Sequence, residues 1–244
     1  MTLLRDRDLT RAFDHAAAGY DRLVSMNPGY HADLRRSARR LRLPDGGEGL
    51  RVLDIGCGTG ASTAALLRVA PGAEITAIDA SAGMLERAAA KSWAGHVRWV
   101  HAPVEEVARA GVQGPFDAVF AAYLFRNVAR PDAVLDRVHA LLRPGGRLAV
   151  HEYSLSGSPV HHALWTAVCR GVIVPTGTLM GDRDLYRYLW RSVLAFDRAP
   201  QFVDRLVRGG FHEARALPMP GWQTGILQTF LARRGASGER RSTS

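Results

Sequence analysis

The chain has 244 residues, 47% of them hydrophobic and 23% charged, which is typical of one globular domain and excludes a disordered chain. No apolar run approaches the roughly 20 residues of a membrane span, no signal peptide is expected, and two cysteines form no disulfide framework, so we expect a cytoplasmic protein. The net charge of +9 comes from arginine, but zinc-finger spacings and long basic runs are absent, so we expect no nucleic-acid partner.

The N-terminal part, residues 1–48, is expected to form a helical cap with one helix at about 2–24 and another at about 28–41. The second helix would turn apolar side chains inward and an arginine cluster outward. This cluster comprises Arg35, Arg36, Arg39 and Arg40. It predicts a possible peripheral contact with an anionic membrane, although an ordinary solvated helix face also explains it.

From residue 49 to residue 153, buried strands alternate with helices. The strands are expected at 50–55, 73–79, 96–101, 116–122 and 147–153. Such alternation predicts a parallel sheet with right-handed crossovers. The alternation then stops, and we expect a helical lid at 154–209, final strands within 210–235 (at 211–217 and 224–232) and a disordered tail at 236–244.

A glycine-rich loop, Asp54-Ile55-Gly56-Cys57-Gly58-Thr59-Gly60-Ala61, follows the first of these strands and opens a helix. It fits either a dinucleotide, with Asp79 roughly 20 residues further on, or S-adenosylmethionine. Asp54 favours the second, because it would repel a pyrophosphate and attract the ammonium and sulfonium groups. Asp79 can bind the ribose hydroxyls of either cofactor, and Gly60 is expected to leave room for the methyl donor.

These motifs resemble the class I S-adenosylmethionine-dependent methyltransferases and, among them, the ubiquinone/menaquinone biosynthesis C-methyltransferase family. The matching segments are Phe13-Asp14, Tyr20-Asp21, Gly29-Tyr30-His31, Arg51–Gly60, Phe125-Arg126-Asn127-Val128, Leu142–Gly146, Glu152-Tyr153-Ser154, Tyr186-Arg187-Tyr188-Leu189 and Gly210-Phe211. The resemblance implies a Rossmann-like α/β class I methyltransferase fold of seven mostly parallel strands, with N-terminal helices and a helical lid inserted after the fifth strand. It departs from the family pattern at Leu34, Pro103, Arg191 and Phe230, among other positions.

For the reaction centre, the resemblance points to Arg126 and Asn127, where Arg126 would stabilise a phenolate or orient a water. Of His151 and Tyr153 we expect at most one to face the pocket, and the resemblance favours Tyr153. His31 would either touch a hydroxyl of the acceptor or lie on the helix surface.

For the cofactor site, Tyr20 is expected to close over the methyl donor. The full set of expected cofactor-binding residues is Tyr20, Asp54, Gly56, Cys57, Gly58, Gly60, Asp79, Ala80, Met84, Ala102, Val104 and Ala121. No metal site is expected, because the pair His161-His162 has no further ligand at a fixed helical offset.

Three functions remain open from the sequence. The first is C-methylation of a demethylmenaquinone-like or other prenylated quinol, which matches the apolar residues of the expected lid. The second is C- or O-methylation of another apolar small molecule, such as a phenol or polyketide, which Arg191 and Phe230 keep open. The third is a non-catalytic cofactor-binding protein or a nicotinamide oxidoreductase.

Overall fold

The computed structural model describes Asp14, residues 29–179 and residues 183–236. Most of the helix expected at 2–24, with Tyr20, and nearly all of the expected tail lie outside these residues. Asp14 is described, and its Oδ1 accepts hydrogen bonds from Ser81 Oγ at 2.5 Å and from the backbone N–H of Gly83 at 3.1 Å.

The described strands follow the alternation that the sequence predicts. They are β1 (Arg51–Ile55), β2 (Glu74–Asp79), β3 (Val97–His101), β4 (Phe116–Ala122), β5 (Leu142–Tyr153), β6 (Phe211–Pro218) and β7 (Leu227–Arg234). The helices are α2 (Tyr30–Arg40), α3 (Ala61–Val69), α4 (Ala82–Ala89), α5 (Pro131–Leu141), α6 (Pro159–Val168), α7 (Val174–Leu179), α8 (Arg183–Ala195) and α9 (Ala199–Arg208). Ser81 is the N-cap of α4, and its Oγ accepts a hydrogen bond from the backbone N–H of Met84.

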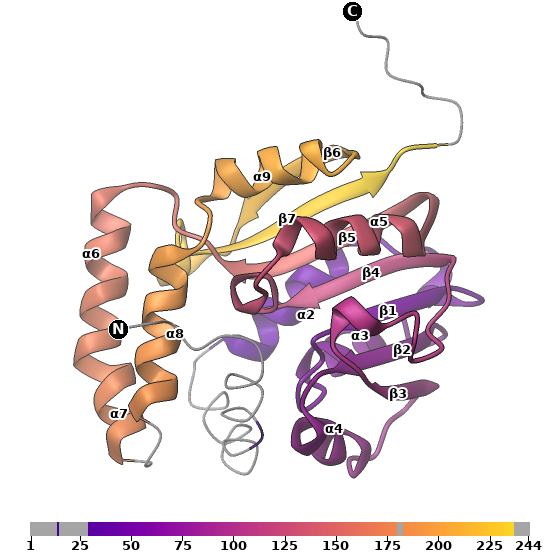
Figure 1. Ribbon diagram of the computed structural model, residues 1–244, viewed down its shortest axis with the longest axis horizontal. Coiled ribbons are helices and arrows are strands. Elements are labelled where there is room, and N and C mark those ends of the chain that lie inside the picture. The colour runs from indigo at the N-terminus through magenta and orange to yellow at the C-terminus, as the bar shows by residue number, and fades with distance from the viewer. Residues whose placement is uncertain (1–13, 15–28, 180–182, 237–244) are drawn as a thin grey trace, which may run out of the picture.

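The seven strands form one sheet in the order β3-β2-β1-β4-β5-β7-β6 (Figure 1). β7 runs antiparallel to both of its neighbours, and the other pairs are parallel. The expected Rossmann-like sheet of mostly parallel strands is therefore confirmed. Because strand order reverses beside β1, the carboxyl ends of β1 and β4 border the crevice where such sheets bind ligands.

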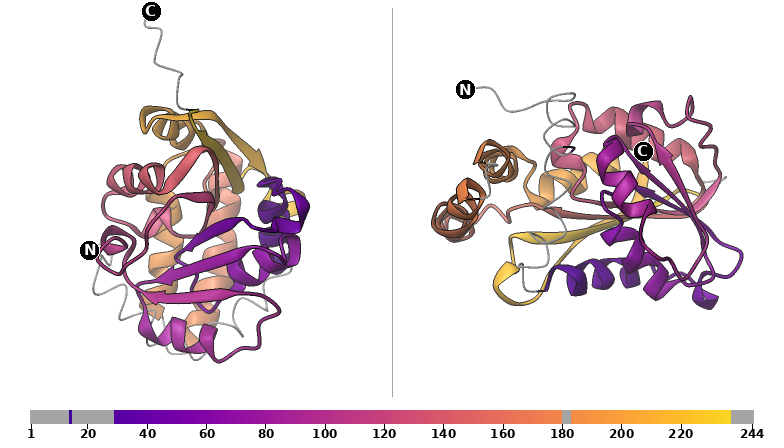
Figure 2. Two further views of the ribbon diagram at one scale, coloured as in Figure 1. Left: turned by 90° about the vertical axis from the view of Figure 1, so that its right-hand side faces the viewer. Right: turned by 90° about the horizontal axis from the view of Figure 1, so that it is seen from below.

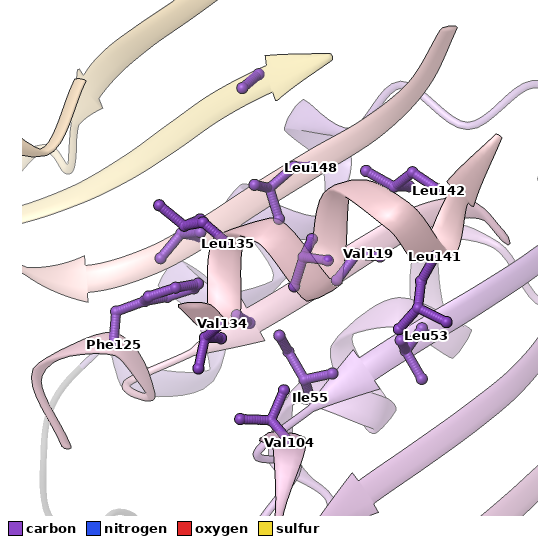
Figure 3. Packing of buried hydrophobic residues seen from close by; sticks show 14 of the residues in the cluster. Leu53, Ile55, Val104, Val119, Phe125, Val134, Leu135, Leu141, Leu142 and Leu148 are labelled. Atoms are coloured by element: carbon purple, nitrogen blue, oxygen red, sulfur yellow. The ribbon is translucent and has the colours of Figure 1, made fainter. Parts of the chain in front are cut away.

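Helices cover both faces of the sheet, with α2 and α5 on opposite sides (Figure 2). On the α5 side, Val134 and Leu135 pack with Ile55 and Val119 in one apolar core, which Figure 3 shows. On the other side, α2, α3 and α4 cover a second core that contains Phe120. β1 therefore contributes alternate residues to the two cores, as a strand buried on both faces must.

Two segments differ from the expected arrangement in ways that change the packing. β5 begins at Leu142, which pairs with Phe116, and the Arg-Pro-Gly-Gly turn then shifts the register so that Ala118 pairs with Arg147. α9, inside the segment expected as a lid, instead packs on the sheet: Phe202 and Leu206 are fully buried in the α5-side core.

The helices α6, α7 and α8, with the π-helical turn Cys169–Ile173, form what we call the helical insertion. It has an apolar cluster separate from both sheet cores, in which Trp165, Cys169 and Val193 pack with Ile226. Within residues 29–179 and 183–236, no helix combines the length and apolarity needed to cross a membrane.

Candidate active site

A cavity of about 670 Å³ opens at the carboxyl ends of β1, β2 and β4. The residues expected at the site that line it are Gly56, Cys57, Gly58, Asp79, Ala80, Met84, Ala102, Val104, Arg126 and Asn127. The structure thus brings the expected cofactor loop and the expected reaction centre into one space. Ala121 does not line it: this residue is fully buried, and Ala122 borders the cavity instead.

The three glycines of the loop share a backbone conformation but have different surroundings. All three have positive φ (70° at Gly56, 55° at Gly58 and 90° at Gly60), a region that favours glycine. At Gly58 a Cβ would meet open space, so this residue keeps its part of the cavity clear. At Gly60 a Cβ would lie 2.6 Å from the ring of Trp93. The expectation that Gly60 leaves room for the cofactor is therefore wrong, because a tryptophan side chain fills that space.

Asp54 lies beneath the loop and is fully buried, outside the cavity lining. Its Oδ2 accepts hydrogen bonds from Ser62 Oγ at 2.8 Å and Thr63 Oγ1 at 2.7 Å. Among the described residues, its Oδ1 has no hydrogen-bond partner. Burial raises the pKa of Asp54 to about 7. A buried carboxylate with an unused acceptor atom fits a cationic ligand group, such as the ammonium of S-adenosylmethionine, and does not fit a pyrophosphate.

Asp79 ends β2 and borders the cavity. Its Oδ2 accepts from the backbone N–H of Gly58 at 2.7 Å and its Oδ1 from that of Ser81 at 2.8 Å. Burial raises its pKa, and these two hydrogen bonds oppose the shift. Because an ionised carboxylate has about four acceptor positions, Asp79 can bind ribose hydroxyls while it still anchors the glycine loop. Burial also raises the pKa of the neighbouring Cys57 thiol well above its usual value.

Arg126 and Asn127 belong to a 3₁₀ turn after β4, Phe125–Asn127. Arg126 forms a buried ion pair with Glu152 of β5, whose carboxylate also accepts from the backbone N–H of Tyr153 at 3.0 Å. Burial raises the pKa of Glu152, and the charge and hydrogen bonds of Arg126 oppose that shift. Two motifs 26 residues apart, Arg-Asn-Val and Glu-Tyr-Ser, are therefore joined by a charge pair that sequence reasoning missed.

His151 and Tyr153 both contact the ring of Tyr123, at centroid distances of 4.9 and 5.2 Å. The expectation that at most one of them faces the pocket holds, although the two side chains share one face of β5, as residues two apart in a strand do. Neither residue lines the cavity directly; Tyr123 does. Sequence reasoning missed Tyr123, although its place directly after β4, at the carboxyl end of a parallel strand, is a usable signal.

Three further residues lie away from the cavity lining. His31 is exposed on α2, so the surface alternative holds for it. Phe230 is fully buried in the sheet core, with its ring 4.7 Å from that of Phe202, and has no bearing on the choice of acceptor. Arg40, expected to point outward, is half-buried and donates to Leu217 O and Thr229 Oγ1.

Comparisons with known proteins agree with this geometry. Residues 52–146 match the family described as "Methyltransferase domain". The ubiquinone/menaquinone biosynthesis C-methyltransferase UbiE of Syntrophotalea carbinolica is 31% identical over 238 residues, which cover 96% of this chain and 97% of the relative.

Solved structures show the same fold. A Thermotoga maritima protein, described as a SAM-dependent methyltransferase and possible histamine N-methyltransferase, aligns with a TM-score of 0.65 at 17% identity, covering 93% of this chain and 99% of its own. Human N-acetylserotonin methyltransferase in complex with SAM aligns with a TM-score of 0.60 at 17% identity, covering 93% of this chain and 57% of its own. The chain belongs to the ubiquinone/menaquinone biosynthesis C-methyltransferase family and is an enzyme that uses S-adenosylmethionine as its methyl donor.

Proposed function

We propose that the enzyme methylates a ring carbon of a quinol that carries an apolar tail, as a demethylmenaquinone-like acceptor does. The observation that carries this proposal is that one cavity joins the glycine loop and Asp79 to an aromatic and cationic wall. This wall consists of Tyr30, Tyr123 and Arg126. An electron-rich ring fits between aromatic side chains, and a guanidinium favours the phenolate that makes its ring carbon nucleophilic.

The geometry supports the following roles for the cofactor-side residues. Asp79 holds the ribose hydroxyls, Gly58 gives the methionine part room, and Asp54, buried beneath the loop with an unused Oδ1, attracts the ammonium group. Ala102 and Val104, with Met84, form the apolar wall against the adenine ring. When bound, S-adenosylmethionine supplies an electrophilic methyl group on a sulfonium, and the protein aligns the acceptor with it and excludes water.

The helical insertion acts as the lid over the acceptor. It meets the reaction centre at two points: Tyr188 Oη donates to Asn127 Oδ1 at 3.0 Å, and the rings of Trp165 and Tyr153 lie 4.8 Å apart. Val160, Leu164 and Val172 of the insertion are exposed. An apolar tail that leaves the cavity would find matching surface there.

A lipid-tailed acceptor also requires contact with a membrane surface. Arg36 and Arg39 are exposed on α2 and can meet anionic headgroups, whereas Arg40 is engaged with β6 and β7. We propose that the exposed pair supplies a weak, salt-sensitive attraction to such a surface.

The test is donor-dependent methylation of a demethylmenaquinone analogue beside a panel of phenols without an apolar tail, with the product atom located by mass spectrometry. We expect the tailed quinol to react with a higher kcat/KM and to gain the methyl group on carbon. Turnover of tail-free phenols alone, or a methyl group on oxygen, would favour the second function, methylation of another apolar small molecule. The same cavity is compatible with that function.

A further inference from the structure

A smaller cavity of about 120 Å³ lies between the end of α2 and the strands β5, β6 and β7. The charged residues that line it are Arg40, Arg42, Arg147, Arg215, Arg233 and Glu213, and we call this site the arginine pocket. Arg147 pairs with Ala118 near the start of β4, whereas Ala122 at the end of that strand borders the active-site cavity. The two sites are therefore separated by about 13 Å along the sheet, at about 3.3 Å per residue.

Strand pairing places three of these arginines on one face of the sheet. Arg147 of β5 lies directly opposite Arg233 of β7, and Arg215 of β6 lies opposite Leu231 of β7. Residues that are opposite each other, or two apart in one strand, point to the same face, and Leu231 belongs to the core that α2 covers. The three arginine side chains therefore leave the sheet on the α2 side, next to the end of that helix.

This arrangement costs free energy, because like charges directly opposite one another destabilise a sheet. Burial lowers the pKa of Arg147, and the charges of Arg233 and Arg42 are among the further causes. Glu213 offsets part of the positive charge, since its Oε2 lies 3.2 Å from Nε of Arg233 and 3.9 Å from Nη1 of Arg215. Among the described residues that line the pocket, five positive charges thus face one negative charge, which favours a bound anion.

The guanidinium groups of the pocket have donors available for such an anion. Arg147 Nη1 donates to the carbonyls of Leu41 and Arg42, while its Nε and Nη2 have no partner among the described residues. Arg233 uses its Nε for Glu213, and the Arg42 side chain makes no hydrogen bond or ion pair with the part of the chain that the structure describes. A guanidinium carries five N–H donors in a fixed fork that matches the oxygens of a phosphate.

Two of the lining residues have strained backbone conformations. Arg42 follows the end of α2 with a φ of 50°, in the left-handed region where glycine is usual. Glu213 has a φ of 53° and lies where the register of β6 against β7 shifts between His212 and Arg215. Such bulges redirect side chains at the edges of sheets, and strained backbone of this kind is concentrated at binding sites.

We propose that the arginine pocket binds one phosphate group, either as a soluble phosphate or as the headgroup of an anionic lipid. The volume of the pocket corresponds to about four water molecules at roughly 30 Å³ each, which suits a single tetrahedral ion. Arg42, Arg147 and Arg233 supply the N–H donors, whereas Arg40, whose guanidinium is held by β6 and β7, adds its charge. The site lies outside the methyl-transfer cavity, so the proposal does not depend on which acceptor the enzyme methylates.

The first test is calorimetric titration of the full chain with inorganic phosphate at low, constant ionic strength. We expect saturable binding at one site per chain. Arg147→Gln and Arg233→Gln should each weaken this binding at least about tenfold, the contribution of one hydrogen bond between charged groups. Because Arg147 also holds the carbonyls at the end of α2, Arg42→Gln is the second variant: it removes no hydrogen bond or ion pair of the described side chains and should weaken phosphate binding by a similar factor.

The matched control is Arg137→Gln, which removes the same charge from an exposed position on α5. This variant should bind phosphate as wild type does. Equal weakening in Arg137→Gln and Arg42→Gln would overturn the proposal, because it would show a general effect of net charge. Absence of saturable phosphate binding to wild type, together with vesicle binding that does not depend on Arg42, would overturn it as well.

Vesicles distinguish the two sources of the phosphate group. Flotation with vesicles of phosphatidic acid, whose headgroup is a terminal phosphate, is compared with flotation with phosphatidylglycerol vesicles of matched surface charge. A preference for phosphatidic acid that Arg42→Gln abolishes would support the pocket as a lipid headgroup site. Equal flotation with both kinds of vesicle, with calorimetric phosphate binding that depends on Arg42, would support a site for a soluble phosphate.

Discussion

The hydroxyl of Tyr188 in α8 donates to Oδ1 of Asn127 at 3.0 Å, and the amide nitrogen of Asn127 donates in turn to the carbonyl of Tyr123 at 2.8 Å. The helical insertion is thus connected to the backbone of the reaction centre through one side-chain amide. We therefore expect closure of the insertion to be coupled to ordering of the turn after β4.

Removing this hydroxyl should loosen the lid. In Tyr188→Phe we expect faster hydrogen exchange in α6–α8, together with a rise of roughly two- to tenfold in the KM of the acceptor, the range of one net hydrogen bond. The affinity for S-adenosylhomocysteine should not change, because Tyr188 lies outside the cavity lining. Exchange in α6–α8 that is as slow as in the sheet, in wild type and variant alike, would show that the insertion is a rigid part of the fold.

Asp54 should make stability and cofactor affinity depend on pH in opposite directions. Its folded pKa of about 7 lies above the unfolded value of 3.8, so the folded state holds the proton between these values and the free energy of unfolding falls as pH rises through them. The asparagine of Asp54→Asn has no proton to lose in this range. The free energy of unfolding of this variant, relative to that of wild type, should therefore increase between pH 4 and pH 8, by about 4 kcal/mol at most. Urea denaturation at several pH values measures the difference.

Cofactor binding provides the second half of that test. The wild-type affinity for S-adenosylhomocysteine, which keeps the ammonium group, should rise from pH 6 to pH 8 as the Asp54 carboxylate forms. In Asp54→Asn the affinity should be lower and nearly independent of pH. A parallel pH dependence in both proteins, measured by calorimetry, would show that the ammonium group does not bind at Asp54.

Asp79→Ala should weaken binding of the methyl donor by roughly one to two decades, since hydrogen bonds to a charged group contribute about 1.5–3 kcal/mol. The loss has two sources, because Asp79 also holds the backbone N–H of Gly58. An S-adenosylhomocysteine analogue without ribose hydroxyls separates these two contributions. The difference between its affinities for wild type and for Asp79→Ala should be smaller than the same difference for S-adenosylhomocysteine. Equal differences for the two ligands would mean that Asp79 only anchors the loop.

Substitutions of Gly58 and Gly60 should have different effects on cofactor binding and on stability. Gly58→Val puts a side chain into the cavity and should abolish binding of S-adenosylhomocysteine, with a further cost in stability because φ is positive at this position. Gly60→Ala pushes a methyl group into Trp93, so it should lower the melting temperature. Calorimetry and thermal unfolding of both variants distinguish the two effects, and a stable Gly60→Ala protein that has lost only cofactor affinity would restore the original expectation for Gly60.

Attraction to anionic vesicles should depend on Arg36 and Arg39. Each exposed arginine near an anionic surface contributes about 1 kcal/mol, so Arg36→Gln with Arg39→Gln should reduce flotation with such vesicles by roughly 30-fold at low salt. The matched control is Arg137→Gln with Arg208→Gln, which removes the same charge from exposed positions on the α5 side of the sheet. Equal losses in the two double variants would indicate a net-charge effect without a defined membrane face.

The parallel sheet and the cofactor loop could be predicted because their signals are local: buried strands with helices between them, and glycines directly after one strand. The roles of Gly60 and Phe230 could not, since each depends on a side chain that distant sequence brings close. Trp93, 33 residues beyond Gly60, occupies the space beside that glycine, and Phe202 packs on Phe230 in the sheet core. The position of the Tyr123 ring depends on the positive φ of this residue, which turns the side chain to the face opposite to the one that strand alternation predicts. The spacing of apolar residues in the sequence does not reveal such an angle.

The separate apolar cluster of the helical insertion has a consequence for how this enzyme can diversify. Trp165, Cys169 and Val193 pack with one another and with the connecting segments, while the sheet keeps its own two cores. Substitutions among α6, α7 and α8 can therefore accumulate without unfolding the part of the molecule that holds the methyl donor. Acceptor specificity can therefore change while binding of the methyl donor is retained. This makes the helical insertion a suitable target for laboratory evolution toward new aromatic substrates.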